Sequence, residues 1–528
     1  MEVDLIVENA TVVTASDIYA SQDIVVRDGK ILAVGQGLKS VFSAKTVIDA
    51  QHGFVMPGGV DSHVHLDQVS LGWPLHPVQE PPFTRDQDNS PTGDNFETGT
   101  RSAIAGGTTT VIAFATQERY HDSLHPVVED YHSRSRGKSY CDYGFHLILT
   151  NPTPTVLRDE LPHYVSEGIS SVKLYMTYDP LKLNDGEILD VMMATRSLGM
   201  TTMVHAENSD MISWITARLA EQKLTAPYYH AVSRPRIAED EATYRVIALA
   251  ELSDVPVLIV HMSSRTAAAH VRAAQTRLLP IHAETCPHYL YLTADALRPH
   301  EHGDDFSGAK HICSPPLRED RMDLEAMWTG VANGTFTTFS SDHAPSKYDH
   351  PEGKKKGLGE DGGMRYDTVP NGLPGVETRM PLLFKGVLSG QVTPQKFVEV
   401  TSANPAKLYG LGASKGAVAA GYDADFVIWY PTAQQAEGNA PAMQSFVLEN
   451  SMLHHDIDYS PFEGMSFENW PRYTILRGRV VWDRDNGGVI GEMGYGDFLR
   501  RGKSTLSKPR NKWVNEFQPM PAAETTTV

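Results

Sequence analysis

Cysteine is scarce in this 528-residue chain, where only Cys141, Cys286 and Cys313 occur, far apart in the sequence. An odd, sparse set without the spacing of a metal finger argues against a disulfide framework and fits a reducing compartment. The first residues, MEVDLIVENATVV, also lack the basic segment and the longer apolar segment of a secretory signal. We therefore expect a cytoplasmic protein.

The chain also lacks a net basic charge and long apolar runs. The chain carries 65 acidic and 46 basic side chains, for a formal net charge of -19. Nucleic acids and anionic membranes both bind basic surfaces, so we expect neither as a partner. No uninterrupted apolar run is long enough to cross a bilayer. Apolar residues make up 41% of the chain and charged residues 21%, which is typical of a globular protein.

The two ends of the chain share a strand-rich pattern. The chain is longer than one hydrophobic core usually organises, so we expect more than one structural unit. Residues 1–55 and 411–486 contain short apolar runs separated by polar turns, which are typical of antiparallel strands. We predict that these two segments pair into one small discontinuous β-sandwich. Residues 487–528 are polar and contain three prolines, and we predict an extended C-terminal arm there.

The middle segment, residues 56–410, has a different pattern. Short apolar runs recur in it, each followed by a polar end and a helix-like stretch. Apolar strands that alternate with helices indicate a parallel sheet covered on both faces. No GxGxxG fingerprint supports a doubly wound open sheet, so we predict an α/β fold with a (β/α)8 TIM barrel, whose active site lies at the carboxyl ends of the strands. The runs span residues 58–66, 108–115, 143–150, 171–178, 201–207, 256–264, 280–288 and 336–344.

Four histidines stand at the ends of these runs. His63 and His65 are two apart on a predicted strand, so both imidazoles face the same side. His205 and His261 each end an apolar run of another βα unit. One such histidine is more often a packed core residue than a ligand, but four at equivalent strand ends should meet at one barrel mouth. We interpret all four as candidate metal ligands.

Lys173 lies in the apolar run SSVKLYMTY, and lysine is almost never fully buried without a partner. Two interpretations remain open. In the first, burial lowers the pKa of the lysine, and the neutral amine reacts with carbon dioxide to give an anionic carbamate that bridges two divalent cations. In the second, the lysine forms an ion pair with a buried carboxylate.

Asp342 ends the last apolar run, in FSSDHAP, and offers a carboxylate at the same mouth. This carboxylate can bind a metal ion, accept a proton from a metal-activated water and deliver it to a leaving nitrogen. Imidazole and carboxylate ligands in this mixture suit zinc, with manganese and cobalt as alternatives.

The remaining histidines and one charge run receive structural interpretations. His343 should point to the opposite side of its strand from Asp342 and support the ligands at most. His288, near another strand end, is the histidine most easily mistaken for a ligand. The lysine run 354–356 lies in a glycine-rich stretch and is interpreted as a solvated loop. Three further histidines are assigned to the surface or to packing: His52, His76 and His146.

Blocks of sequence around these candidates follow one another along most of the chain. Their order and spacing resemble the dihydropyrimidinase and hydantoinase branch of the amidohydrolase superfamily. Taken together the blocks are highly specific. They read VMPGGVDSHVHLD, SVKLYMTY, MVHAEN, HAVSRP, VHMSS, ETCP, SPPLR, SSDHAP, VPNGLPGVETRM, TSANPAKLYGL and SPFEGM.

The resemblance implies a barrel with a small β-sandwich and a centre of two divalent metal ions, zinc in the first instance. Carbon dioxide would supply the carboxyl group of a modified lysine (N6-carboxylysine). A hydroxide would bridge the two ions together with this group. The implied ligands are His63, His65 and Asp342 for one ion, His205 and His261 for the other, and carboxylated Lys173 for both.

The same resemblance assigns roles in a reaction. Asp342 would be the general acid/base, and Tyr178 would stabilise the oxyanion. Backbone groups at Ser314 and Asn371 would bind a small cyclic amide. The implied reaction is hydrolysis of the ring amide of 5,6-dihydropyrimidines or 5-substituted hydantoins to N-carbamoyl amino acids. Family members are commonly tetramers, so we expect a homo-oligomer, a tetramer or a dimer.

One segment departs from the family pattern. An insertion, residues 68–93, should lie at the barrel mouth, where Trp73 and Phe83 could contribute apolar contacts of a lid. It leaves open a second enzyme hypothesis, in which the same mechanism acts on allantoin, a cyclic imide or a xenobiotic lactam. A third hypothesis is a non-catalytic oligomeric scaffold, as in the related collapsin response mediator proteins. The complete set of ligand positions argues against the scaffold.

Overall fold

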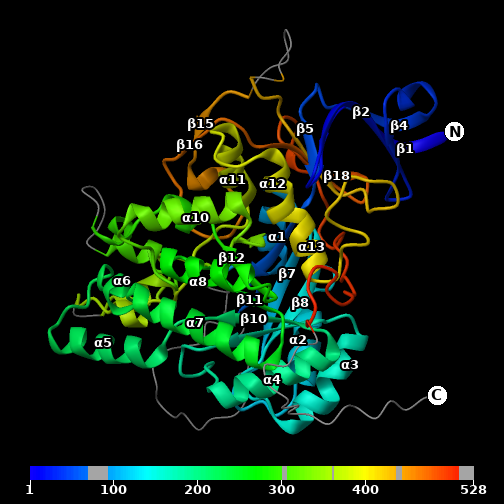
Figure 1. Cartoon of the computed structure of the whole chain (residues 1–528). Helices are drawn as coiled ribbons and strands as arrows, with labels where there is room; N and C mark the ends of the chain where they lie inside the picture. Colours follow the sequence, from blue (N-terminus) through cyan, green and yellow to red (C-terminus); the bar gives the residue numbers. More distant parts are fainter. Residues whose placement is uncertain (69–92, 300–305, 360–361, 434, 436–442, 511–528) are drawn as a thin grey trace, which may run out of the picture.

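The strands of this chain, in a computed structural model, form two main sheets: one parallel, the other built from both chain ends (Figure 1). The structure describes residues 1–68, 93–299, 306–359, 362–433, 435 and 443–510. Apart from its two end residues, the predicted insertion lies outside the described residues. The predicted lid with Trp73 and Phe83, and the assignment of His76, therefore concern residues outside the described part.

The parallel sheet is a barrel of eight strands in sequential order. Its first and last members are joined by a parallel bridge between Val64 and His343 and by a hydrogen bond from the His65 N–H to the His343 carbonyl, 2.7 Å long. This closure confirms the predicted (β/α)8 barrel. The strands are β6 (Gly59–Val64), β7 (Thr108–Thr116), β8 (Asp142–Ile148), β9 (Ser171–Tyr175), β10 (Thr201–His205), β11 (Val257–Ile259), β12 (Ile281–Thr285) and β13 (Thr338–Phe339).

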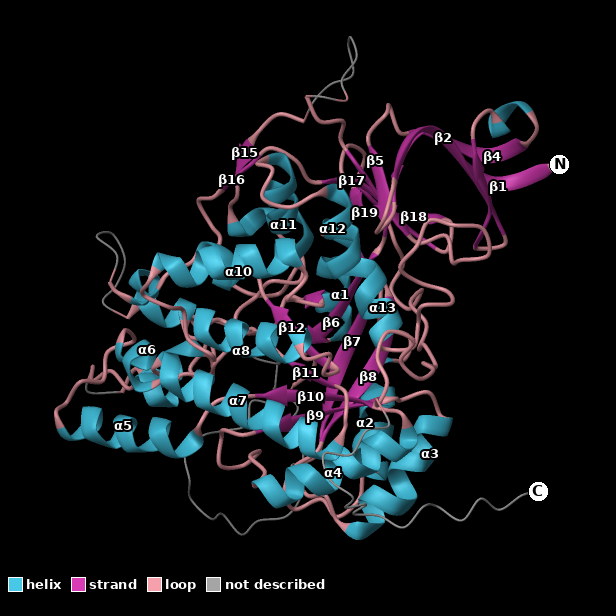
Figure 2. Ribbon diagram, in the orientation of Figure 1, coloured by secondary structure: helices cyan, strands magenta, loops and turns pink. Residues whose placement is uncertain are grey.

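Each barrel strand overlaps one of the predicted apolar runs, and nearly every strand residue is buried. The reason is that side chains on one face fill the barrel while those on the other face pack against helices, so neither face meets water. The helices outside the sheet are drawn in Figure 2. They are α1 (Phe96–Ala105), α2 (His125–Ser135), α3 (Leu161–Ser166), α4 (Asp185–Leu198), α5 (Ser209–Glu221), α6 (Tyr229–Ser233), α7 (Arg236–Ser253), α8 (Arg265–Thr276), α9 (His288–Tyr291), α10 (Arg321–Asn333), α11 (Arg379–Leu388), α12 (Pro394–Val398) and α13 (Asn404–Leu408).

Local signals explain where several helices begin and end. The Asn95 side chain before α1 accepts a hydrogen bond from the Thr98 N–H, and the Asn95 N–H donates one to the Thr98 hydroxyl, which makes a capping box. Asn184 and Glu187 repeat this arrangement at α4, and Gly199 ends that helix with a φ of 71°. Short 3-10 and π segments complete the connections. They are η1 (Leu38–Ser40), η2 (Val156–Glu160), η3 (Ala294–Leu297), η4 (Ser307–His311), η5 (Lys354–Gly357), η6 (Tyr366–Thr368), η7 (Glu399–Ala403) and η8 (Asn450–Met452).

The second sheet combines the two ends of the chain in one small β domain, as predicted. Its central contact is antiparallel pairing of β5 with β14, in which Val55 lies opposite Ile428. The sheet branches at β1, which pairs with β4 along its first half and with β5 near its end. An apolar cluster that includes Val7, Ile24 and Phe426 fills its interior. The strands are β1 (Glu2–Val13), β2 (Ile18–Arg27), β3 (Lys30–Gly35), β4 (Ser43–Asp49), β5 (Phe54–Pro57), β14 (Phe426–Trp429), β17 (Pro471–Leu476), β18 (Arg479–Asp483) and β19 (Gly488–Val489), with β15 (Phe446–Val447) and β16 (Ser466–Phe467) as a separate pair.

The chain after β19 runs back along the barrel as far as it is described. Leu499 donates its N–H to the Tyr143 carbonyl of β8 over 2.7 Å, and Arg501 donates to the Gly168 carbonyl over 2.9 Å. These backbone hydrogen bonds attach the segment to the barrel. Among the described residues, no helix combines the length and the apolar character that crossing a membrane requires.

A buried cluster of charges joins the β domain to the barrel. Lys415 binds Asp142 of β8 over 2.6 Å, Asp423 over 3.0 Å and Asp425 next to β14. Burial opposes the charged form of the lysine, but the three carboxylates outweigh it and raise the pKa of Lys415 above its usual value. Arg477 adds a second cation to Asp142. The junction therefore depends on cations held between buried carboxylates.

Replacing Lys415 should destabilise the protein. Lys415→Met leaves buried carboxylates without their cation, and we expect the free energy of unfolding to fall by about 3–5 kcal/mol. Thermal and urea unfolding measure this change. Lys45→Met is the matched control, because it removes a lysine–aspartate pair whose lysine side chain is 65% exposed, where such pairs contribute little. Equal unfolding midpoints for the two variants would contradict the assignment.

Candidate functional site

The carboxyl ends of the barrel strands meet at one mouth, and the six predicted ligands lie there. A cavity of about 600 Å³ opens at this mouth; five of the six line it, and the sixth, Lys173, is fully buried. The strands explain the convergence, because side chains at equivalent ends of a closed parallel barrel point to a common centre. His63 lies on β6 and His65 just after it, Lys173 on β9, His205 at the end of β10, His261 just beyond β11 and Asp342 beyond β13.

Three of these side chains form a compact group. The Nε2 atom of His63 lies 3.0 Å from Oδ1 of Asp342, and Nε2 of His65 lies 3.7 Å from the same oxygen. The potential ligand atoms of the three residues all lie within 4.8 Å of one another. Neutral imidazole nitrogens and a carboxylate at this spacing suit a divalent cation such as zinc.

The protonation states of this group also suit a metal ion. Burial alone would raise the pKa of Asp342, but His63 and His65 hold it well below its usual range, so the carboxylate is ionised. Burial and the neighbouring His63 hold the pKa of His65 well below 6.5, so its ring is neutral. No described residue binds the buried Nδ1 of His65. Asp342 and His65 are thus in the deprotonated state that a metal ligand needs. At His63, burial and Lys173 lower the pKa, but Asp342 and Glu284 outweigh them and raise it above its usual value.

Lys173 lies against the same group. It is completely buried, and its Nζ atom is 3.4 Å from Nε2 of His63. Burial lowers the pKa of Lys173 to about 8. Among the described residues, no carboxylate forms an ion pair with its Nζ; the nearby carboxylates of Glu284 and Asp342 contact His63 instead. The second interpretation, a direct ion pair, is therefore not supported by a partner in the described part of the chain. The aromatic rings of Phe114 and Tyr175 flank the amine at 4.9 and 5.1 Å.

His205 and His261 form a second pair beside the compact group. Their ring centroids are 4.3 Å apart, and the ring of His261 is 5.4 Å from that of His63. No described residue binds the buried Nδ1 of His261. Nε2 of His205 lies 2.7 Å from Oε2 of Glu207, so a metal ion bound through this nitrogen would replace that contact. The pair fits a second cation next to the first.

Three residues of the mouth have an unusual backbone. Tyr178, His261 and Asp342 adopt φ angles of 67°, 38° and 48°. This left-handed region is unfavourable for residues with a β-carbon and tends to occur at functional sites, where surrounding structure imposes it. All three are residues for which the sequence predicts a role at the site.

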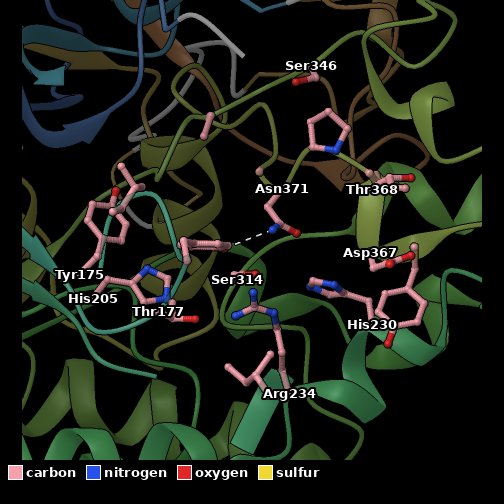
Figure 3. A pocket seen from close by; sticks show the side chains of 18 of the residues that line it. Tyr175, Thr177, His205, His230, Arg234, Ser314, Ser346, Asp367, Thr368 and Asn371 are labelled. Atoms are coloured by element: carbon pink, nitrogen blue, oxygen red, sulfur yellow. Dashed lines mark hydrogen bonds between the residues drawn. The ribbon is translucent and has the colours of Figure 1, made fainter. Parts of the chain in front are cut away.

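The predicted substrate-binding residues line the same cavity. The Asn371 side-chain amide donates to the hydroxyl of Tyr178 over 3.1 Å (Figure 3). Burial raises the pKa of Tyr178 above its usual value, so its hydroxyl keeps its proton as a donor. Ser314 also lines the cavity. The guanidinium of Arg234 lies 5.0 Å from the Tyr178 ring.

Buried acidic residues that the sequence interpretation missed hold the histidines. Oε1 of Glu284 on β12 lies 2.6 Å from Nδ1 of His63, which turns Nε2 of that ring toward Asp342. Glu207 bridges His205 and Arg234, each over 2.7 Å. Both glutamates stand in blocks that carry the resemblance, ETCP and HAEN, and that position was the available signal.

The other histidines lie outside the ligand group. His343 is buried with its Nε2 3.1 Å from Oδ2 of Asp94, on the barrel closure. His288 is buried beside its strand end, and burial lowers its pKa to about 4. His146 is packed inside the barrel, and His52 is exposed.

The interpretation of residues 354–356 as a solvated loop is wrong for the first lysine. Lys354 has no exposed surface, and Lys355 and Lys356 are half-buried. The first lysine is buried because three backbone carbonyl groups bind its Nζ. The local sequence does not reveal these partners, because they lie on other segments of the chain.

Comparison with known proteins identifies the family to which this chain belongs. The model of the amidohydrolase family matches residues 54–481. The chain belongs to the amidohydrolase family. A D-hydantoinase from Ralstonia pickettii is 37% identical over 502 residues, which cover 95% of this chain and 99% of the relative. A D-phenylhydantoinase from Escherichia coli is 36% identical, and the aligned region covers 94% of this chain and 98% of the relative. The crystal structure of a dihydropyrimidinase from Brevibacillus agri superposes with a TM-score of 0.83 at 35% identity, covering 94% and 98% of the two chains.

Glu284 offers a test of how the candidate metal ligands of this amidohydrolase are oriented. Glu284→Gln should lower metal affinity about 10–100-fold, because Nδ1 of His63 loses its charged partner. Metal content after dialysis against graded chelator concentrations measures the loss.

A matched control for Glu284 comes from the same strand. His282 stands two residues before Glu284 on β12, is half-buried and binds the hydroxyl of Thr337, not a candidate ligand, so His282→Asn should keep the metal content of the unchanged protein. Normal metal retention in Glu284→Gln would show that this carboxylate does not orient the ligand.

Proposed function

We propose that this amidohydrolase opens the ring amide of 5-substituted hydantoins and 5,6-dihydropyrimidines and releases N-carbamoyl amino acids. The names of its relatives, D-hydantoinase, D-phenylhydantoinase and dihydropyrimidinase, support this substrate class. The observation that carries the proposal is the buried group of His63, His65 and Asp342 at the mouth of a ligand-sized cavity. The third hypothesis, a scaffold without activity, does not explain this group.

The proposed cofactor is a pair of divalent ions, zinc in the first instance. One ion would be held by His63, His65 and Asp342, the other by His205 and His261. When bound, the two ions would polarise the scissile carbonyl and lower the pKa of a water molecule. The neutral state of His65 and the ionised state of Asp342 support this assignment.

Lys173 is proposed to act as a carbamate. Its neutral amine would attack the carbon of carbon dioxide, forming one N–C bond and releasing one proton, to give an anionic group with two oxygens. The pKa of about 8 makes a substantial neutral fraction available near neutral pH. The distance of 3.4 Å from Nζ to the His63 ring supports a ligand role shared by both ions.

Asp342 is proposed as the general base and then the general acid. Its ionised carboxylate would accept a proton from the attacking water and return the proton to the ring nitrogen as the C–N bond breaks. The strained backbone at Asp342 supports a fixed orientation for this transfer.

The ring is proposed to bind between Tyr178 and the loops of Ser314 and Asn371. The Tyr178 hydroxyl, protonated in its buried place, would donate to the developing oxyanion. Backbone groups at Ser314 and Asn371 would bind the amide edge. The hydrogen bond between Asn371 and Tyr178 supports a shared orientation of these groups.

The size of the cavity supports a substituted ring. A volume of about 600 Å³ belongs to the range of sites for drug-sized ligands and exceeds the needs of a bare five- or six-membered ring. Beyond the ligands the cavity is lined by Ile212, Thr216 and Ala217 of α5 and by Tyr366 and Val369. We therefore propose an apolar substituent at ring position 5.

We also propose a cytoplasmic location and assembly into a homo-oligomer, a tetramer or a dimer. The three cysteines are unpaired and buried, which fits a reducing compartment. Apolar side chains exposed on neighbouring helices, such as Trp214 on α5 and Tyr244 on α7, support burial between subunits.

Ring opening is the direct test of the substrate class. Zinc-loaded protein should hydrolyse hydantoins with apolar 5-substituents faster than bare hydantoin or dihydrouracil, because the cavity accommodates the substituent. Release of N-carbamoyl product is followed by chromatography, with the two enantiomers of each substrate assayed separately. Chelator should abolish turnover and zinc should restore it.

The second enzyme hypothesis is tested in the same panel with allantoin, cyclic imides and lactams. No turnover of any hydantoin or dihydropyrimidine by protein that holds two metal ions would refute the proposed substrate class. Turnover of one of the alternative rings would then establish the second hypothesis.

Lys173→Ala should cost at least about a hundredfold in kcat/KM, since even outer partners of metal ligands cost 10–100-fold. Short carboxylic acids such as acetate should restore part of the activity by supplying the missing oxygens. Lys182→Ala is the control, because Lys182 follows the same strand but forms an ion pair with Asp179; its activity should not respond to added acid. Full activity of Lys173→Ala without acid would rule out the carbamate.

A further inference from the structure

Lys354 is a buried cation without an acidic partner in the described part of the chain. It begins η5 and has no exposed surface. Its Nζ atom donates to three backbone carbonyl oxygens, those of Ile312 over 3.0 Å, Pro370 over 2.7 Å and Gly372 over 2.7 Å. Burial lowers the pKa of Lys354 to about 7. Three acceptors at these distances need three N–H donors, which only the ammonium form has.

The three carbonyl groups belong to the two loops that form the substrate side of the cavity. Pro370 and Gly372 stand on either side of Asn371, and Ile312 stands two residues before Ser314. The loops also touch each other directly, because Gly372 donates its N–H to the Ile312 carbonyl over 3.0 Å. The Lys354 side chain therefore forms hydrogen bonds with both loops and links them.

The hydrogen bond to Pro370 has an electronic consequence for Asn371. The Pro370 carbonyl and the Asn371 N–H belong to one peptide group, so a cation on the oxygen makes the N–H a stronger donor. Among the described residues the Asn371 N–H has no acceptor. Asn371 itself lines the cavity.

We propose that Lys354 is a positioning residue for substrate: it holds the loops of Ser314 and Asn371 together and strengthens the Asn371 N–H as a donor to the ring amide. The proposal rests on the proposed function, since it takes these loops to bind the ring. Lys354 does not touch the substrate and acts through the peptide groups that it binds.

The test is Lys354→Met in the full-length, zinc-loaded protein. Charged hydrogen bonds contribute enough that KM for a 5-substituted hydantoin should rise about tenfold or more, while kcat changes less than about threefold. The Kd of a non-hydrolysed ring analogue, measured by calorimetry, should rise by the same factor. Metal content should be unchanged, because Lys354 contacts none of the candidate ligands.

Two further variants make the result decisive. Lys355→Met is the matched control, because the adjacent lysine binds Asp349 with 35% of its side chain exposed, and both KM and Kd should stay as in the unchanged protein. Lys354→Gln keeps two N–H donors without the charge and should give an intermediate Kd.

The outcomes separate this inference from the proposed function. Unchanged KM and Kd in both Lys354 variants of an active enzyme would overturn the inference and leave the proposed function intact. Loss of the folded state in both variants would also overturn it, since Lys354 would then serve the fold and not the site. An unchanged protein that opens no hydantoin would instead refute the proposed function.

Discussion

The functional mouth depends on one contact, the closure of the barrel between its first and last strands. The His65 N–H donates to the His343 carbonyl over 2.7 Å, and Val64 bridges the same residue. In an open sheet these strands would lie at opposite edges, and His63 could not approach Asp342. With the barrel closed, two segments nearly three hundred residues apart supply ligand atoms 3.0 Å from each other. A contact of 3.1 Å between Nε2 of His343 and Oδ2 of Asp94 anchors the closing residue.

Carboxylates buried around the mouth are held by arginines, and this pairing makes an acidic interior tolerable. Each pair places a guanidinium against an oxygen that would otherwise lose its hydration without compensation. Two of these carboxylates also accept backbone N–H groups at strand ends, Glu239 from Ser263 and Asp61 from Ser341. The pairs are Glu207 with Arg234 at 2.7 Å, Glu239 with Arg318 at 2.6 Å and Asp61 with Arg379 at 3.4 Å.

The barrel and the positions of its candidate ligands were predictable because they are local features of sequence. A strand covered on both faces reads as a continuous apolar run, and a histidine at its end is visible as such. The roles of Glu284 and Lys354 were not predictable in this way. Each is defined by partners far away in the sequence, His63 for the first and three carbonyl groups for the second. Backbone carbonyls carry no residue identity, so a lysine that binds them looks like any solvated lysine.

The pairing of β5 with β14 has a consequence for synthesis of the chain. Val55 pairs with Ile428, so the partner of this early strand is synthesised more than three hundred and seventy residues later. At about 5–20 residues per second this delay is roughly 20–75 s. During that interval the apolar faces of β1, β2 and β5 lack the strands that complete their sheet. A domain split between the two chain ends thus leaves apolar strand faces of the nascent chain uncovered during most of translation, although the barrel is made of consecutive units.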